Sequence, residues 1–235
     1  MLTIVFDLDG TLIDTAPDLI DTLNVVLTRQ GLPPVPLETG RNLIGGGAKV
    51  TIERALAAEG RTCAPAEIDR LYAAFVAHYA DHLADRSRPF PDLEGALDQL
   101  AAAGHRLAVC TNKLERLSVR LLNILKLAPR FAAICGQDTF GIQKPDPEVF
   151  RRTVLRAGGN PAAAIMIGDS KTDVYTARAA QVPVIAVDFG YSDVPIVSLK
   201  PDRVIGSFSD LPRAVTALAA ERQPSDPGKP PLTIS

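Results

Sequence analysis

Two aspartates stand one residue apart near the start of the chain, in the stretch FDLDGTL at residues 6–12. In an extended strand, residues i and i+2 face the same side, so Asp7 and Asp9 can point in similar directions. Two carboxylates at that spacing raise each other's pKa unless a cation lies between them. The pair therefore indicates either a site for a cation or a phosphoryl group, or a strand that simply ends in a D-G turn.

Polar side chains also follow several of the later apolar runs. The runs at 106–110, 131–135 and 164–168 each lead, directly or shortly afterwards, to hydroxyl, amide, ammonium or carboxylate groups. Ligands of parallel α/β sheets bind at the carboxyl ends of the strands, so we expect these groups to meet at one edge. The candidate site residues are Asp7, Asp9, Thr111, Asn112, Lys144, Asp169, Ser170 and Asp173.

The chemistry of this set favours magnesium and phosphate. It contains carboxylates, one lysine and a hydroxyl, but no histidine or cysteine, and oxygen ligands of this kind suit Mg²⁺ better than zinc or copper. A carboxylate nucleophile that attacks a phosphoryl group fits the composition. Because an ionised aspartate repels a phosphate dianion, Mg²⁺, Lys144 and the Thr111 hydroxyl would have to offset that repulsion.

The composition limits the class of protein. The chain has 235 residues, 46% of them hydrophobic and 22% charged, as in an ordinary globular protein. A formal net charge of −2 leaves no basic surplus, so we expect neither a nucleic-acid nor a membrane partner. The three cysteines form no CxxC pair, and neither a secretion signal nor a membrane span is recognisable, so the cytoplasm is the expected location. The expected partner is a small phosphorylated metabolite, and the sequence leaves the oligomeric state open.

The order of elements predicts an inserted helical unit. Apolar residues at helical spacing recur over 17–30, 48–60 and 68–79, whereas strands and helices alternate after the proline-rich RPFPD at 88–92. The predicted fold class is α/β, with a doubly wound, Rossmann-like parallel-sheet core and an all-helical cap inserted after the first strand. The expected ranges are 1–15 with 89–220 for the core, 16–88 for the cap and 221–235 for a disordered tail.

Four stretches of this sequence, FDLDGTL, VCTNK, QKPDP and GDSKTD, resemble the four motifs of the haloacid dehalogenase-like phosphohydrolases, in their usual order. The similarity covers residues 1 to 215. It implies that Asp7 is the nucleophile, which forms an aspartyl-phosphate. It further implies that Asp9 is first the general acid for the leaving oxygen and then the base for water.

The same resemblance implies the binding roles. Thr111 and Lys144 would bind the phosphoryl group. Mg²⁺ would be held by the Asp7 carboxylate, the Asp9 main-chain oxygen and Asp169, with Asp173 in support.

Two further stretches, NLIGGGAKV and GYSD, resemble phosphoglycolate phosphatases. The glycines at 45–47 permit a close backbone approach, and Lys49 or Arg41 nearby could meet a small carboxylate. The alternative is a flexible helix junction with solvated basic residues. The resemblance makes 2-phosphoglycolate the expected substrate. A pyrophosphatase, a sugar-phosphate phosphatase or phosphomutase, and a non-catalytic metal- or phosphate-binding regulatory relative are the alternatives.

Overall fold

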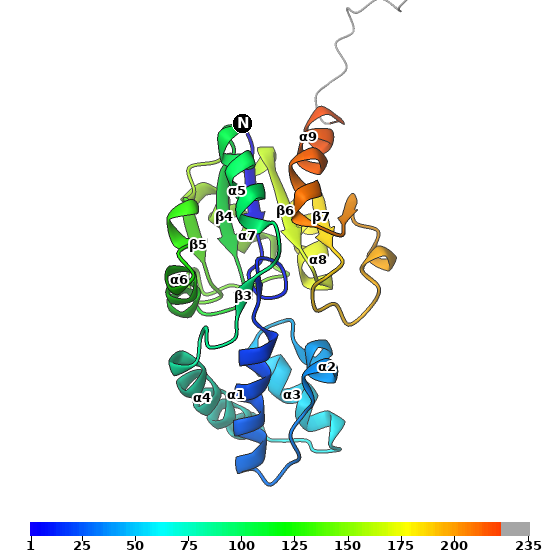
Figure 1. Ribbon diagram of the computed structural model, residues 1–235. Helices are drawn as coiled ribbons and strands as arrows, with labels where there is room; N and C mark the ends of the chain where they lie inside the picture. The colour runs from blue at the N-terminus through cyan, green and yellow to red at the C-terminus, as the bar shows by residue number, and fades with distance from the viewer. Residues whose placement is uncertain (222–235) are drawn as a thin grey trace, which may run out of the picture.

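A six-stranded parallel sheet forms one part of the molecule and a group of helices the other (Figure 1). The computed structural model describes residues 1–221. The strand order is β5-β4-β1-β6-β7-β8, so β1 lies between β4 and β6. The strands are β1 (Thr3–Phe6), β4 (Arg106–Cys110), β5 (Ala133–Cys135), β6 (Ala164–Gly168), β7 (Val184–Val187) and β8 (Arg203–Ile205).

Helices cover both faces of this sheet, because its central strands are apolar on both sides. Ile4, Val5 and Phe6 of β1 are fully buried, and their side chains alternate between two separate apolar clusters. One cluster includes residues of α5 (Leu93–Ala102), α6 (Glu115–Ile124) and α9 (Leu211–Glu221). The other includes residues of α7 (Pro147–Arg156) and α8 (Lys171–Ala180). The predicted doubly wound α/β core is therefore confirmed.

The helical part, which we call the cap, is inserted between β1 and the rest of the sheet (Figure 1). Its helices are α1 (Ala16–Arg29), α2 (Leu37–Gly40), α3 (Ala48–Ala58) and α4 (Pro65–Asp81). Apolar stripes on α1, α3 and α4 meet in a third apolar cluster, which Leu117 and Tyr191 join from the sheet part of the molecule. The ranges 1–15 with 89–220 and 16–88 stay our proposed division.

The chain enters and leaves the cap at the same place. β2 (Ile13–Asp14) and β3 (Arg88–Pro89) pair in antiparallel fashion, with Asp14 opposite Arg88. Beside them, the buried carboxylate of Asp18 accepts hydrogen bonds from the main-chain N–H groups of Arg86 and Ser87 and from the Ser87 hydroxyl. The first turn of α1 is thus tied to the segment that leaves the cap.

Some elements differ from the sequence-based expectation. The strand expected at 131–135 begins only at Ala133, and β2, β3 and β8 were not predicted. The tail expected at 221–235 lies outside the described residues except for Glu221, which ends α9. Within residues 1–221, no helix is both long enough and apolar enough to span a bilayer.

Candidate active site

Asp7 follows the last residue of β1 and is fixed there on one side of its carboxylate. Its main-chain N–H donates to the Ile167 carbonyl of β6, which carries the hydrogen bonding one residue beyond the strand. Asp7 Oδ1 accepts from the Leu8 main-chain N–H at 2.7 Å and lies 2.9 Å from Lys144 Nζ. The other oxygen, Oδ2, accepts no hydrogen bond from the described residues, and Asp7 lines a cavity between the cap and the sheet. Protein contacts therefore hold one carboxylate oxygen of Asp7 in place, whereas the other can contact a ligand in the cavity.

Lys144 is a buried cation between two carboxylates. Its Nζ lies 2.6 Å from Asp173 Oδ1 as well as 2.9 Å from Asp7, and its side chain is 1% exposed. Burial alone would lower the pKa of this lysine, but the charges of Asp173 and Asp7 raise it above its usual value. Lys144 therefore stays protonated and supplies a fixed positive charge at the nucleophile.

Asp169 follows β6 and approaches the first motif closely. Its carboxylate accepts from the Thr11 hydroxyl at 2.9 Å and from the Tyr191 main-chain N–H at 2.7 Å. Gly10, with φ of 81°, has no room for a side chain because a Cβ there would collide with the Asp169 carboxylate. This close approach explains the glycine in FDLDGTL.

The carboxylates of Asp7, Asp169 and Asp173 form an acidic cluster that fits a divalent cation. Each offers an oxygen within 4.8 Å of the oxygens of the other two. Asp173 is already occupied by Lys144 and by the Ser170 hydroxyl at 2.7 Å. Burial and the neighbouring carboxylates raise the pKa of Asp169 to about 8, and burial raises that of Asp7 to about 6. An excess of buried negative charge with oxygen donors is the environment that a hard cation such as Mg²⁺ stabilises.

The segment after β4 brings Thr111, Asn112 and Lys113 to the same cavity. The Thr111 hydroxyl accepts from the Lys113 main-chain N–H at 3.2 Å. The Asn112 side chain is used structurally: it donates to the Lys144 carbonyl at 3.0 Å and accepts from the Lys144 N–H at 2.9 Å. Asn112 thus holds the backbone that presents Lys144.

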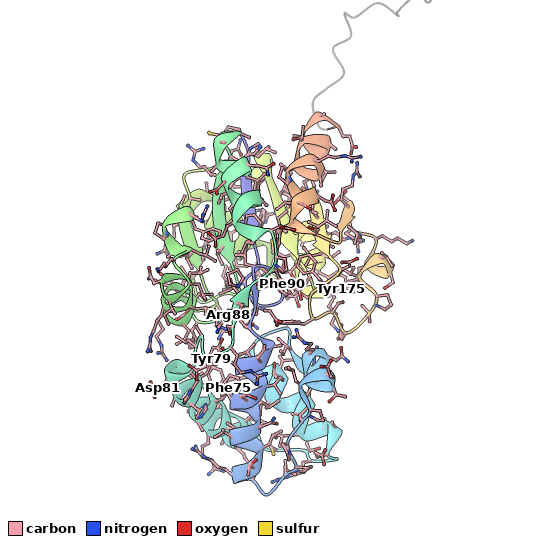
Figure 2. The ribbon with its side chains drawn as sticks, in the orientation of Figure 1. Phe75, Tyr79, Asp81, Arg88, Phe90 and Tyr175 are labelled. Atoms are coloured by element: carbon pink, nitrogen blue, oxygen red, sulfur yellow. The ribbon has the colours of Figure 1, made fainter. Side chains whose placement is uncertain are left out.

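Two residues at this site were assigned no chemical role from the sequence. Lys113 Nζ lies 2.8 and 3.0 Å from the two carboxylate oxygens of Asp9, with its side chain 6% exposed. The ring of Tyr79, from cap helix α4, covers this ammonium at 4.4 Å from Nζ to the ring centroid. Figure 2 shows Tyr79 and Phe75 at the end of the cap that faces the sheet. Lys113 could have been noticed as a charged residue after a strand, but a tyrosine in an apolar stripe carries no such signal.

Arg41 and Lys49 do not line the cavity. Both nitrogens of the Arg41 guanidinium donate to Asp14 at 2.9 Å, at the base of the cap. Lys49 Nζ lies 2.5 Å from Asp69 on the exposed surface between α3 and α4. In contrast, the other predicted site residues all lie in the cavity wall or, like Asp173, directly behind it.

Comparison with known proteins assigns the family. The family model for haloacid dehalogenase-like hydrolases matches residues 4–187, which include the cap and the strands from β1 to β7. The chain belongs to this family. A phosphoglycolate phosphatase from Mesorhizobium japonicum is 48% identical over 219 residues, with 93% of this chain and 95% of the relative covered. One from Agrobacterium fabrum is 47% identical, with 90% and 91% covered.

Solved structures of haloacid dehalogenase-like hydrolases share the architecture. The structure of a predicted phosphoglycolate phosphatase from Haemophilus somnus 129PT has a TM-score of 0.82 at 29% identity, and covers 91% of this chain and 97% of its own. Together with the family model and the relatives, this likeness identifies the chain as a phosphatase.

Proposed function

We propose that this phosphatase is a Mg²⁺-dependent phosphomonoesterase that acts through an aspartyl-phosphate on Asp7, and that its substrate is 2-phosphoglycolate. The observation that carries the proposal is the state of the Asp7 carboxylate. One oxygen is held by Lys144 and the Leu8 N–H, whereas the other has no partner among the described residues. A carboxylate fixed in this way is suited to nucleophilic attack.

The reaction divides into two displacements at phosphorus. First, Asp7 Oδ2 attacks, the bond from phosphorus to the ester oxygen breaks, and Asp9 gives a proton to the departing alkoxide. Then Asp9 takes a proton from water, the water oxygen attacks phosphorus, and the bond to Asp7 breaks to release phosphate. Lys113 Nζ lies 2.8 and 3.0 Å from the two Asp9 oxygens, beside the group that transfers the proton in both steps.

The remaining groups stabilise charge on the phosphoryl oxygens. Lys144 and the Thr111 hydroxyl, both in the cavity wall, are the donors we assign to them, and Asn112 and Asp173 keep Lys144 in place. When bound, Mg²⁺ supplies further positive charge for the phosphoryl group. The Asp7 and Asp169 carboxylates and the Asp9 main-chain oxygen would hold it.

The substrate proposal is supported by the names of the relatives and by the shape of the site. The most similar relatives described above are phosphoglycolate phosphatases. The cavity is lined by residues of the cap as well as the sheet, including Ile44, Phe75 and Tyr79. A cavity of this kind, lined from both sides, suits a small substrate. The cytoplasmic location stays a prediction from the sequence.

A substrate panel tests the proposal. kcat/KM should be measured with Mg²⁺ for 2-phosphoglycolate, pyrophosphate, sugar phosphates and a nucleoside monophosphate, with Asp7→Asn as the blank. We expect 2-phosphoglycolate to lead by about a hundredfold, equivalent to about 2.7 kcal/mol of transition-state stabilisation. A flat profile would remove the substrate assignment, and absence of Mg²⁺-dependent turnover of any phosphoester would favour a regulatory relative.

A further inference from the structure

The cavity has few positive charges with which to recognise an anionic leaving group. Among the described residues, Lys113 and Lys144 are the cationic side chains in its wall. Lys144 is engaged by Asp7 and Asp173 at the nucleophile. Arg41 and Lys49 are paired with other carboxylates outside the cavity. Lys113 is paired as well, but with Asp9 and not with the nucleophile, so it is the cation of the cavity wall that we consider for a group beyond the phosphoryl site.

Lys113 keeps spare donor capacity where it stands. An ammonium has three N–H groups, and its two contacts to the Asp9 oxygens use at most two of them. Asp9 is the proposed proton donor to the ester oxygen, so a group that contacts both Asp9 and substrate lies beside that oxygen. Lys113 is thus placed for a charge only a bond or two beyond the ester oxygen.

Tyr79 adds an unused hydroxyl at the same place. Its side chain is 2% exposed and lines the cavity, and its hydroxyl has no hydrogen-bond partner among the described residues. Leaving a buried hydroxyl unpaired costs about 1–3 kcal/mol. Burial also raises the pKa of Tyr79 to about 12, so the phenol keeps its proton at neutral pH. Because the hydroxyl atom itself is covered in this structure, the Tyr79 side chain has to shift for a ligand oxygen at Lys113 to become its partner.

The backbone opposite these side chains also favours an anion. Gly46, Gly47 and Ala48 line the cavity where α3 begins, and a helix N-terminus carries partial positive charge. A Cβ on Gly47 would lie 3.4 Å from the Asn112 carbonyl, which places this turn against the residue that precedes Lys113. The glycine turn and Lys113 therefore lie close together.

From these observations we propose that Lys113 and Tyr79 bind the carboxylate of the leaving group, and that the enzyme selects phosphomonoesters with a carboxylate on the carbon that bears the ester oxygen. The inference rests on the proposed function and names the residues that give it specificity. Lys113 donates to a carboxylate oxygen while it remains near Asp9, and the Tyr79 hydroxyl donates a second hydrogen bond from the cap. A residue of the core and a residue of the cap thus bind the same carboxylate.

A matched pair of substrates separates this role from an indirect effect through Asp9. 2-Phosphoglycolate and phosphoglycolamide have nearly the same size, but the second carries an uncharged carboxamide in place of the carboxylate. For each enzyme, the measured quantity is the ratio of kcat/KM for the acid to that for the amide. Loss of Asp9 function lowers both rates equally, so it leaves this ratio unchanged.

Four variants complete the experiment. We expect the ratio to be about 100 in the wild type and below about 5 in Lys113→Met, as befits a charge-assisted hydrogen bond in a buried site. Tyr79→Phe should lower the ratio about fivefold to tenfold and leave thermal stability unchanged or raised, since it deletes an unpaired hydroxyl. Arg70→Met, which removes a charge from the exposed face of α4, is the control and should keep the wild-type ratio. Lys49→Met tests the rival cap lysine.

The outcomes are distinct. A wild-type ratio near one overturns the 2-phosphoglycolate assignment and this inference together. A high wild-type ratio that survives in Lys113→Met, or that collapses in Lys49→Met instead, overturns the inference and leaves the proposed function standing. Weaker binding of glycolate to Lys113→Met than to Arg70→Met, measured by calorimetry, would support the subsite without any reference to turnover.

Discussion

The hydroxyl of Tyr191 donates a hydrogen bond to the carboxylate of Asp14, 2.5 Å away, at the strand that leads into the cap. The same hydroxyl accepts from the Ala16 N–H at 2.9 Å, where α1 begins. At the other end of the residue, the Tyr191 main-chain N–H donates to Asp169. A single residue therefore joins the entry of the cap to the acidic cluster.

Replacing Tyr191 with phenylalanine should disturb the cap and leave the acidic cluster intact. The change deletes the two hydroxyl hydrogen bonds but keeps the main-chain bond to Asp169. We expect the free energy of unfolding to fall by about 1–3 kcal/mol and kcat/KM to fall about tenfold. Urea unfolding and steady-state kinetics measure these effects.

The control for this variant is Tyr175→Phe, because Tyr175 is 46% exposed on α8. It should match the wild type. Mg²⁺ affinity, measured by calorimetry, should change less than about twofold in Tyr191→Phe. A large loss of Mg²⁺ affinity would contradict the separation of the two ends of the residue.

Asp18→Ala should destabilise the segment by which the chain leaves the cap. The carboxylate of Asp18 is 2% exposed and satisfies the N–H groups of Arg86 and Ser87, so its removal leaves buried donors unpaired. We expect a loss of about 2–4 kcal/mol in unfolding free energy and faster proteolysis near residues 86–88. Asp21→Ala is the matched control, because Asp21 meets the exposed side chain of Arg86 and such pairs contribute less than about 1 kcal/mol. Equal effects of the two substitutions would refute the prediction.

Lys144→Met should destabilise the metal-free protein by about 3–5 kcal/mol, because it leaves the buried carboxylate of Asp173 without its cation. Adding Asp173→Asn to this variant removes the uncompensated charge and should recover at least about 1 kcal/mol. Urea unfolding without Mg²⁺ measures both. Lys171→Met, at a side chain 42% exposed, should cost less than about 1 kcal/mol. A double variant no more stable than Lys144→Met would contradict the charge argument.

Stabilisation by Mg²⁺ should increase with pH. In the folded, metal-free protein, burial and the neighbouring carboxylates raise the pKa of Asp169 from 3.8 to about 8. Between these values the folded protein keeps a proton that the unfolded chain has lost, so this group's contribution to stability is complete below about pH 4 and disappears as the pH rises through about 8. In the proposed function Mg²⁺ binds the ionised form of Asp169, so its binding would replace this proton.

Thermal unfolding with MgCl₂ and with chelator, at about pH 5.5 and about pH 8, checks this expectation. The increase in Tm caused by Mg²⁺ should be larger at the higher pH. Asp169→Asn should remove most of the difference between the two pH values. An equal Mg²⁺ effect at both pH values in the wild type would show that Asp169 does not compete with a proton.

The parts of the fold that the sequence predicts are those determined locally. Continuous apolar runs such as AIMIG have to be buried on both sides, and the residue after each run then lies at the carboxyl edge of the sheet. That rule alone predicts that Asp7, Thr111 and Asp169 lie close together. The strands β2 and β3 have two residues each, too few to show the alternation of apolar and polar residues that predicts a strand. They form only through their pairing with each other.

The contacts between cap and core could not be predicted from the sequence, because they depend on tertiary structure. Tyr79 occupies an apolar stripe of α4, where a tyrosine looks like a core residue until the cap meets Lys113. Arg41 lies close in sequence to the glycine turn, yet folding pairs it with Asp14, 27 residues earlier. Arg41 and Lys49 were predicted to bind a carboxylate because of their charge and their proximity to the glycine turn. The pairing of each with a carboxylate elsewhere could not be predicted from the local sequence.

Because β2 pairs with β3, the cap is a unit that can be replaced as a whole. Because the two chain crossings are neighbours, a helical unit of another length or shape can be inserted there without altering the register of β1 between β4 and β6. The strands that carry the reacting groups and the helices that border the leaving group can therefore vary independently. New substrate ranges are accessible to such a chain through changes in one contiguous segment, while the phosphoryl chemistry stays as it is.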